Sequence, residues 1–374
     1  MKLVITGGHH SSALPVIKKI KSISPEARIY WIGHKRSLKG DENDTLEYKE
    51  ISSLGIPFYD LMAGKVYRTF DLARLIKVPI GFFQSLALLT KLKPDVILSF
   101  GGYLAAPVVL AGYILGIPSI THEQTVVVGY ANKLISFFAK KILISWPQSE
   151  KIFPKNKTVL VGIPVREEIT RVLSSTALDS VFSTDNGLPT VFIMGGKTGS
   201  HLLNILVKNS LRKLLSSCNV IHMCGDNSVY RDYETLSILY SSMEGNTAGK
   251  YFPRKFIFEN EIGEAYKKSD LVVSRAGAHT IAELLTTRKP CILIPIPWVS
   301  HNEQFENASL LERAGLAKIV EEKDCIGGSF VNTIKGMLGN VKMFTLKDSS
   351  LLSLLKSDSA ERIAHETIKL AQKH

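Results

Sequence analysis

Short apolar runs alternate with longer segments of helical pattern along the whole chain. In the first half the apolar runs lie at 2–6, 28–32, 95–100, 117–121, 141–145 and 158–161. They are continuous stretches rich in Val, Ile and Leu, which is typical of strands buried on both faces of a parallel sheet. We therefore expect the first half to form a doubly wound α/β domain.

The same pattern restarts after about residue 187. Further strands are predicted within 186–196, 219–225, 269–277 and 290–297, and a helix is predicted over 200–216. The sequence thus predicts two similar domains, at 1–164 and 165–357, joined by a linker around 162–168. A capped amphipathic segment at 358–374 is expected to form a C-terminal helix that joins the first domain.

One long apolar stretch, from Val96 to His122, contains no Asp, Glu, Lys or Arg. Its length would suit a membrane-spanning helix. Glycines and prolines interrupt it, however, and we interpret it as a strand, a buried helix and a second strand.

Charge and length narrow the class of protein. The chain has 374 residues, which agrees with two domains, and a net charge of +12. Such a charge favours an anionic partner, although a basic solvated surface would also account for it. Nucleic acid, a phosphorylated substrate and an acidic membrane surface are all partners of the required negative charge.

Residues 65–93 hold six basic residues against one acidic residue, together with aromatic and leucine side chains. This composition suits attachment to an anionic membrane. The alternative is a core-facing helix with a basic solvent side. Because the chain starts directly with the strand-like MKLVI, we expect no signal peptide.

Candidate chemistry lies in the loops that follow the predicted strands, because ligands bind beyond the carboxyl ends of such strands. After the first strand comes Thr6-Gly7-Gly8-His9-His10, which suits a phosphate cradle, a catalytic histidine or a plain turn. Later strands are followed by Gly101-Gly102-Tyr103 and by His122-Glu123-Gln124-Thr125. The second of these segments suits acid–base work or a hydrogen-bonded structural pair.

Two loops of the second domain complete this set. The first, at 195–200, contains Gly-Lys-Thr, but P-loop spacing requires a glycine at position 191, where the chain has Val191. The second, at 275–283, leads from a strand through Gly277 into a helix whose first amides suit a diphosphate. Glu283 in that helix suits the two hydroxyls of a ribose, or simply favours the helix N-terminal region. Neither zinc nor calcium motifs are present, and the four cysteines form no metal-binding pattern.

Taken in order, these segments resemble the MurG-type UDP-N-acetylglucosamine transferases of glycosyltransferase family 28. The resemblance rests on TGGH at 6–9, GGYLAAPVVLAGYILGIPSITHEQ at 101–124, MGGKTGSHLLN at 194–204 and SRAGAHTIAELL at 274–285. It implies a GT-B fold, that is, two Rossmann-like domains with the donor nucleotide on the C-terminal one.

The resemblance also implies a reaction and a location. The family transfers GlcNAc with inversion from UDP-GlcNAc to the muramyl sugar of undecaprenyl-diphosphate-linked lipid I, giving lipid II for peptidoglycan. It implies no metal or other cofactor, no nucleic-acid partner, and a peripheral position on the cytoplasmic face of an anionic membrane. Alternatives are another GT-B UDP-sugar enzyme with a different lipid-linked acceptor, a UDP-sugar epimerase, or a non-enzymatic binding module. The sequence carries no signal for an oligomeric state.

By position, the resemblance assigns residues to each substrate. Those implied for the donor are Arg166, Gly196, Lys197, Glu259, Ala278, His279, Thr280, Ile281, Ala282, Glu283 and Gln304. Those implied for the acceptor and its phosphates are Thr6, Gly7, Gly8, His10, Gly101, Gly102, Tyr103, Gln124 and Thr125. His9 matches the general base, with His10 and Glu123 as alternatives. The chain departs from the family in a shorter first glycine loop and at Thr125, Ile163 and Lys197.

Overall fold

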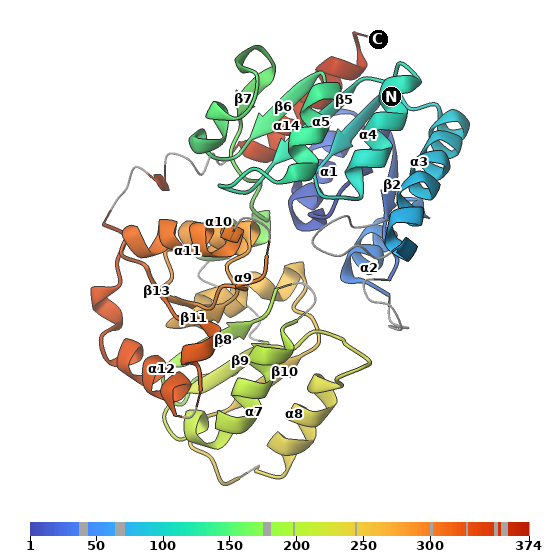
Figure 1. Ribbon diagram of the computed structural model, residues 1–374. Coiled ribbons are helices and arrows are strands. Elements are labelled where there is room, and N and C mark those ends of the chain that lie inside the picture. Colours follow the sequence, from blue (N-terminus) through green and yellow to red (C-terminus); the bar gives the residue numbers. More distant parts are fainter. Residues whose placement is uncertain are drawn as a thin grey trace. The chain divides into compact units, whose positions relative to one another are not determined.

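The computed structural model describes all residues except 37–43, 64–71, 175–180, 197–198, 244, 300–301, 327, 348–350, 353–357 and 374. The chain forms two compact units, and the boundary between them falls after Val165. The first unit also contains the C-terminal segment, so the chain returns to it at its end (Figure 1).

The first unit is built on a seven-stranded parallel sheet with the order β3-β2-β1-β4-β5-β6-β7. Its strands are β1 (Lys2–Thr6), β2 (Arg28–Gly33), β3 (Phe58–Asp60), β4 (Val96–Ser99), β5 (Ser119–Glu123), β6 (Lys141–Ile144) and β7 (Thr158–Leu160). Its helices are α1 (His10–Ile23), α2 (Leu46–Ser53), α3 (Leu72–Leu92), α4 (Ala105–Ile114), α5 (Tyr130–Phe138) and α14 (Ser359–Ala371), with 3-10 turns η1 (Pro147–Lys151) and η2 (Lys155–Lys157).

Two apolar layers bury the faces of this sheet. Helices α1 and α14 pack together in one layer, and α3, α4 and α5 lie beside one another in the other (Figure 1). The β1, β4, β5 and β6 runs are buried along nearly their whole length, as expected for strands covered on both faces. An ion pair from Lys141 of β6 to Glu366 of α14 adds to the attachment of the last helix.

The second unit repeats this plan with a six-stranded parallel sheet in the order β10-β9-β8-β11-β12-β13. Its strands are β8 (Thr190–Met194), β9 (Asn219–Met223), β10 (Tyr251–Arg254), β11 (Leu271–Ser274), β12 (Cys291–Leu293) and β13 (Ala317–Ile319). Its helices are α6 (Glu167–Ser174), α7 (His201–Leu215), α8 (Asp232–Ser241), α9 (Glu259–Lys268), α10 (Ala278–Thr287), α11 (Glu303–Arg313) and α12 (Ser329–Gly339), with 3-10 turns η4 (Glu322–Asp324) and η5 (Val341–Met343).

The sequence pattern missed three strands, and all three lie at sheet edges. They are β3, β10 and β13, with the sequences FYD, YFPR and AKI. Each is only partly buried, so each lacks the continuous apolar run that identifies an internal strand. The predicted internal strands are confirmed.

The apolar stretch from Val96 to His122 forms β4, α4 and most of β5, which confirms the strand–helix–strand interpretation. Among the described residues, no helix is both long enough and apolar enough to cross a bilayer. Part of the basic and aromatic stretch at 65–93 lies outside the described residues, and the remainder forms α3, in which Pro79 is accommodated.

Candidate functional site

The first candidate loop joins β1 to α1 and contacts the loop that follows β4. These strands are neighbours at the point where the strand order reverses, so their carboxyl-end loops meet. The Gly8 amide donates to the Gly101 carbonyl at 3.2 Å. Gly7 has a φ of 129°, and a Cβ at this position would lie 2.8 Å from the backbone carbon of Phe100. The two loops therefore pack backbone against backbone, which leaves no room for a side chain at Gly7.

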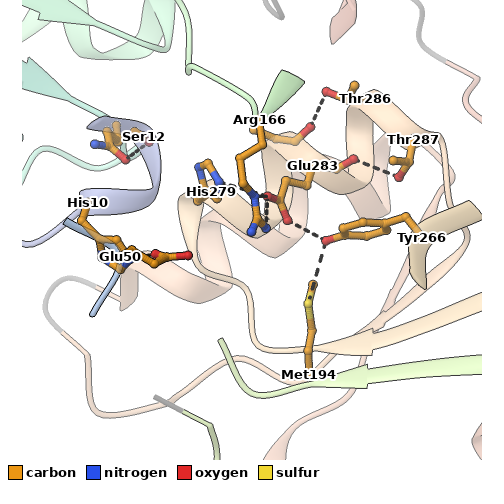
Figure 2. A network of polar contacts seen from close by, with 12 residues as sticks. His10, Ser12, Glu50, Arg166, Met194, Tyr266, His279, Glu283, Thr286 and Thr287 are labelled. Carbon is orange, nitrogen blue, oxygen red and sulfur yellow. Dashed lines mark hydrogen bonds and ion pairs between the residues drawn. The ribbon is translucent and has the colours of Figure 1, made fainter. Parts of the chain in front are cut away.

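The two adjacent histidines have different environments. His9 is exposed and stands at the N-cap position of α1 without a side-chain capping hydrogen bond, whereas His10 is buried in the first turn. The Nε2 atom of His10 lies 2.6 Å from the Glu50 carboxylate on α2 (Figure 2). The two imidazoles therefore diverge, and His9 presents the accessible ring.

Glu123, at the end of β5, is buried and organises the loop that follows it. One carboxylate oxygen accepts from the amide and the hydroxyl of Thr125, and the other accepts from the Gly129 amide and from Nδ2 of Asn132. Burial raises the pKa of the Glu123 carboxyl above its ordinary value, although these hydrogen bonds act in the opposite direction. Glu123 thus holds the loop and α5 in place through both of its oxygens.

Neighbouring side chains extend this buried polar set. His122 contacts the Gly162 carbonyl and Ser145, each at 3.0 Å, and burial lowers its pKa to about 4, so the ring is neutral at neutral pH. Gln124 accepts a hydrogen bond from Ser12 of α1 at 2.9 Å. Its Nε2 atom and the hydroxyl of Thr6 are buried without a hydrogen-bond partner among the described residues. Unsatisfied donors of this kind are uncommon, and these two belong to the segments singled out for phosphate contact.

Asn132 of α5 belongs to this buried polar set but was not among the predicted site residues. It links Glu123 to Thr121 of β5, and its Nδ2 atom lies 2.5 Å from where a Cβ on Gly101 would stand. Tyr103 follows that glycine pair and is 37% exposed. Helix α5 also carries Lys133 and Ser136, so residue type alone does not single out Asn132, and its partners Thr121 and Glu123 lie on a different element, β5.

In the second unit, Arg275 joins three loops at the carboxyl end of the sheet. Its Nε donates to Ser200, the N-cap of α7, at 3.1 Å, and its Nη1 donates to the Ile294 carbonyl at 3.0 Å. Nη1 also lies 2.7 Å from a carboxylate oxygen of Glu322. Arg275 therefore fixes the far side of the second glycine loop. Gly196 adopts a positive φ in this loop, and Lys197 lies outside the described residues.

The segment predicted to bind the donor runs from β11 into α10, with Gly277 as the N-cap. The helix begins at Ala278, so the first turn carries amide groups without partners inside the helix. Such a terminus favours an anion through its amides and its dipole. Four further predicted residues follow Ala278 in α10. His279 and Thr280 are partly buried, and Ile281 and Ala282 are fully buried.

Glu283 lies in the second turn of α10 and is only 2% exposed (Figure 2). Its Oε1 accepts from Arg166 Nε and Nη2 at 2.9 and 2.5 Å, and lies 3.0 Å from His279 Nε2. Its Oε2 accepts from the Tyr266 hydroxyl at 2.8 Å. Burial by itself raises the pKa of Glu283, but Arg166 and His279 together bring it down to about 2.

Two further predicted donor residues come from α11 and α9. Oε1 of Gln304 accepts from the Ala276 amide at 3.3 Å and from the Ile296 amide at 3.1 Å. This orients the side-chain amide between the ends of β11 and β12. Glu259 is the first residue of α9. The described residues include no cluster of three or more His, Cys, Asp or Glu side chains that suits a metal ion.

The chain resembles proteins of one family over nearly its whole length. Residues 5–144 match the glycosyltransferase family 28 N-terminal domain, and residues 190–363 match the C-terminal domain of that family. A relative from Clostridium kluyveri is 31% identical over 386 residues, which cover 100% of this chain and 99% of the relative. This chain belongs to glycosyltransferase family 28.

Two of the relatives carry the same name. A relative from Clostridium tetani is 31% identical over 93% of this chain and 94% of its own length. It and the Clostridium kluyveri protein are both named UDP-N-acetylglucosamine--N-acetylmuramyl-(pentapeptide) pyrophosphoryl-undecaprenol N-acetylglucosamine transferase. As a family 28 glycosyltransferase, the chain is an enzyme of the class expected from its sequence.

Solved structures establish the fold of this family 28 enzyme. The structure of Acinetobacter baumannii MurG superposes with a TM-score of 0.66 at 22% sequence identity. The match covers 98% of this chain and 99% of the MurG chain. A UDP-GlcNAc 2-epimerase from Neisseria meningitidis has a TM-score of 0.60 at 15% identity, and each chain is covered in full. The predicted fold class, GT-B with two Rossmann-like parallel-sheet domains, is confirmed.

Proposed function

We propose that this enzyme transfers GlcNAc from UDP-GlcNAc to the muramyl sugar of undecaprenyl-diphosphate-linked lipid I, giving lipid II. The observation that carries the proposal is the likeness, end to end, to relatives that bear this activity in their names. The arrangement of both units supports it, because each places glycine-rich loops and helix N-termini at the carboxyl end of its sheet.

We assign the donor to the second unit. The amides at the start of α10 face the UDP diphosphate, and Glu283 accepts the ribose hydroxyls. Arg166 and His279 contact the Glu283 carboxylate, and Gln304 contacts backbone amides beyond the ends of β11 and β12. Because the Glu283 pKa is lowered, its carboxylate is ionised at neutral pH and acts as a hydrogen-bond acceptor.

We assign the acceptor diphosphate to the paired glycine loops of the first unit, and the role of general base to His9. His9 is exposed at the first loop, whereas His10 is held by Glu50 and Glu123 by its loop contacts. An imidazole is a side chain that can accept the proton of a sugar hydroxyl as that hydroxyl attacks.

The reaction is then a single displacement. The C4 hydroxyl of the muramyl sugar attacks C1 of GlcNAc on the face opposite UDP, and the imidazole of His9 takes its proton. The bond from C1 to the UDP oxygen breaks, and the electron pair leaves with UDP. A positioned base typically contributes about 10²–10⁴-fold. Stabilisation of the departing diphosphate by the α10 amides contributes much of the remainder.

We further propose that the enzyme binds the cytoplasmic face of the membrane through α3, α4 and α5. Exposed apolar side chains gather on this layer: Val78, Ile80 and Phe83 on α3, Tyr113 and Ile114 on α4, and Tyr130, Leu134 and Phe137 on α5. Lys133 lies 5.7 Å from the Tyr130 ring centroid, which places a cation within the apolar group. An exposed apolar face that includes the cation of Lys133 suits an anionic lipid surface.

The test is incubation of the purified enzyme with UDP-GlcNAc and a short-chain lipid I analogue, with mass spectrometry of the products. We expect a disaccharide on the lipid diphosphate and one equivalent of UDP. A parallel reaction without acceptor separates the epimerase alternative, which would convert the sugar nucleotide by itself. Absence of disaccharide from folded enzyme would refute the proposal.

A further inference from the structure

Tyr266 of α9 has a fully buried side chain beside the Glu283 carboxylate. Its hydroxyl donates to Oε2 of Glu283 at 2.8 Å across the interface between α9 and α10 (Figure 2). Its ring packs edge-on against Phe192 of β8, with 5.5 Å between centroids, and its oxygen lies 3.9 Å from Met194 Sδ. Contacts with β8 therefore fix the position of the Tyr266 ring, and its hydroxyl donates to one carboxylate oxygen of Glu283.

The other carboxylate oxygen is held from a different direction. Oε1 of Glu283 receives Arg166, which precedes α6, and His279 from the first turn of α10. The terminal torsion of a glutamate is broad and has no sharp rotamer wells. Contacts on both oxygens are thus what define the plane of this carboxylate, and Tyr266 supplies the contact on the Oε2 side.

The hydroxyl of Tyr266 acts as a permanent donor. Burial and the neighbouring Glu283 carboxylate raise the Tyr266 pKa well above its ordinary value, so the proton stays on the tyrosine at physiological pH. The hydrogen bond joins a neutral donor to an ionised acceptor, which makes it stronger than a bond between neutral groups.

We propose that Tyr266 is a positioning residue that orients the Glu283 carboxylate and thereby sets the preference of the enzyme for a ribonucleotide donor. This inference rests on the proposed function, in which Glu283 accepts the ribose hydroxyls. A carboxylate oxygen accepts about two hydrogen bonds, so Oε1 is occupied by the two N–H groups of Arg166, and the remaining acceptor capacity lies on Oε2 beside Tyr266. The 2′ hydroxyl of a ribose can reach this one position only when the plane of the carboxylate is set, whereas a 2′-deoxyribose lacks that hydroxyl and depends less on the plane.

The experiment compares UDP-GlcNAc with its 2′-deoxyribose analogue as donors for the Tyr266→Phe enzyme. We expect KM for UDP-GlcNAc to rise about tenfold, as for loss of a hydrogen bond to a charged group, with kcat changed less than about twofold. The ratio of kcat/KM between the two donors should fall toward one. Tyr251→Phe is the matched control, because it removes another buried hydroxyl of this unit, one that contacts His222 at 2.8 Å.

A double-mutant cycle separates positioning from a general structural effect. If Tyr266 acts through Glu283, Tyr266→Phe adds less than about twofold to the KM of the Glu283→Gln enzyme. Equal effects of Tyr266→Phe in both backgrounds would overturn the inference. Should Tyr266→Phe fail to fold, ring-fluorinated tyrosine at this position keeps the shape and makes the hydroxyl a stronger donor. It should keep the donor ratio at or above that of the unmodified enzyme, and a ratio as low as that of Glu283→Gln would overturn the inference.

Different results would refute the ribose role of Glu283 and the positioning role of Tyr266. If Glu283→Gln leaves the preference for the ribonucleotide donor unchanged, the ribose role of Glu283 in the proposed function is wrong, and the inference is wrong with it. If Glu283→Gln removes the preference but Tyr266→Phe retains it, the ribose role stands and the inference about Tyr266 is wrong.

Discussion

At the scale of single residues, Glu123 and Glu283 were both predicted as site carboxylates from segments that follow a strand. Their pKa values are nevertheless shifted in opposite directions. Both are buried near the carboxyl end of a parallel sheet. Glu123 is surrounded by neutral donors, and burial raises its pKa. Glu283 lies beside Arg166 and His279, which lower its pKa to about 2. The groups packed around each carboxylate therefore decide its pKa: neutral donors of the following loop and α5 for Glu123, and the cation of the distant Arg166 together with His279 for Glu283.

The lowered pKa of Glu283 predicts how stability depends on pH. A carboxyl whose pKa is lower in the folded state stabilises the fold above its unfolded pKa, and this contribution is lost as the pH falls toward the folded pKa. The unfolding free energy of the native enzyme should exceed that of Glu283→Gln at neutral pH. We expect this difference to shrink by at most about 3 kcal/mol as the pH falls from about 4.5 to 2. Urea unfolding of both proteins across this range measures it. A constant difference would contradict the prediction.

The proposed base gives a second prediction at this scale. His9→Ala should lower kcat by about 10²–10⁴-fold and leave UDP affinity unchanged, because the side chain acts on the acceptor hydroxyl. Steady-state transfer to the lipid I analogue and calorimetric titration with UDP measure the two effects. His365→Ala, on the exposed face of α14, is the control. A variant that retains native kcat would remove His9 from the mechanism.

At the scale of elements, the contact between the β1 and β4 loops governs what their sequences tolerate. Gly7 has a φ of 129° and its missing Cβ faces the Phe100 backbone at 2.8 Å, whereas a Cβ at Gly8 would meet no atom within 4 Å. The same dipeptide thus contains one position with a steric requirement and one without.

Substitution of these two glycines makes a matched pair. We expect Gly7→Ala to lower the unfolding free energy by about 2–4 kcal/mol, because both the backbone strain and the clash oppose the native loop. Gly8→Ala should change it by less than about 1 kcal/mol. Thermal and urea unfolding compare them. Equal losses would mean that the loop contact is not the cause.

At the scale of the whole molecule, the first unit carries an unusual concentration of exposed apolar side chains on α3, α4 and α5. Phe137 of α5 is 75% exposed and Leu134 is 51% exposed. These side chains do not contribute to the core of the unit, so replacing them should leave the fold intact while changing what the surface binds.

Vesicle sedimentation tests the membrane surface directly. Phe137→Glu with Leu134→Glu should weaken binding to vesicles rich in anionic lipid by at least about tenfold, because it removes apolar burial and adds repulsion. Turnover of a water-soluble acceptor analogue should remain unchanged. Ile238→Glu on α8, at a position 72% exposed in the second unit, is the control. Undiminished vesicle binding would place the membrane contact elsewhere.

The internal strands and the order of the glycine loops were readable from sequence because each depends on local signals. Continuous apolar runs mark strands covered on both faces, and glycines mark the turns at their ends. The edge strands β3, β10 and β13 escaped because a short, half-buried strand needs no such run. Asn132 and Tyr266 escaped because their importance lies in partners that no local pattern identifies.

The sequence by itself determined the fold class and the family, since burial periodicity and ordered motifs are properties of the chain. Only the tertiary structure decided how the candidate residues are used. His9 and His10 are adjacent in sequence, yet the first is exposed and the second is buried against Glu50. Glu283 owes its charge to Arg166, which is 117 residues away. Protonation, exposure and orientation depend on distances in space, and folding alone sets those distances.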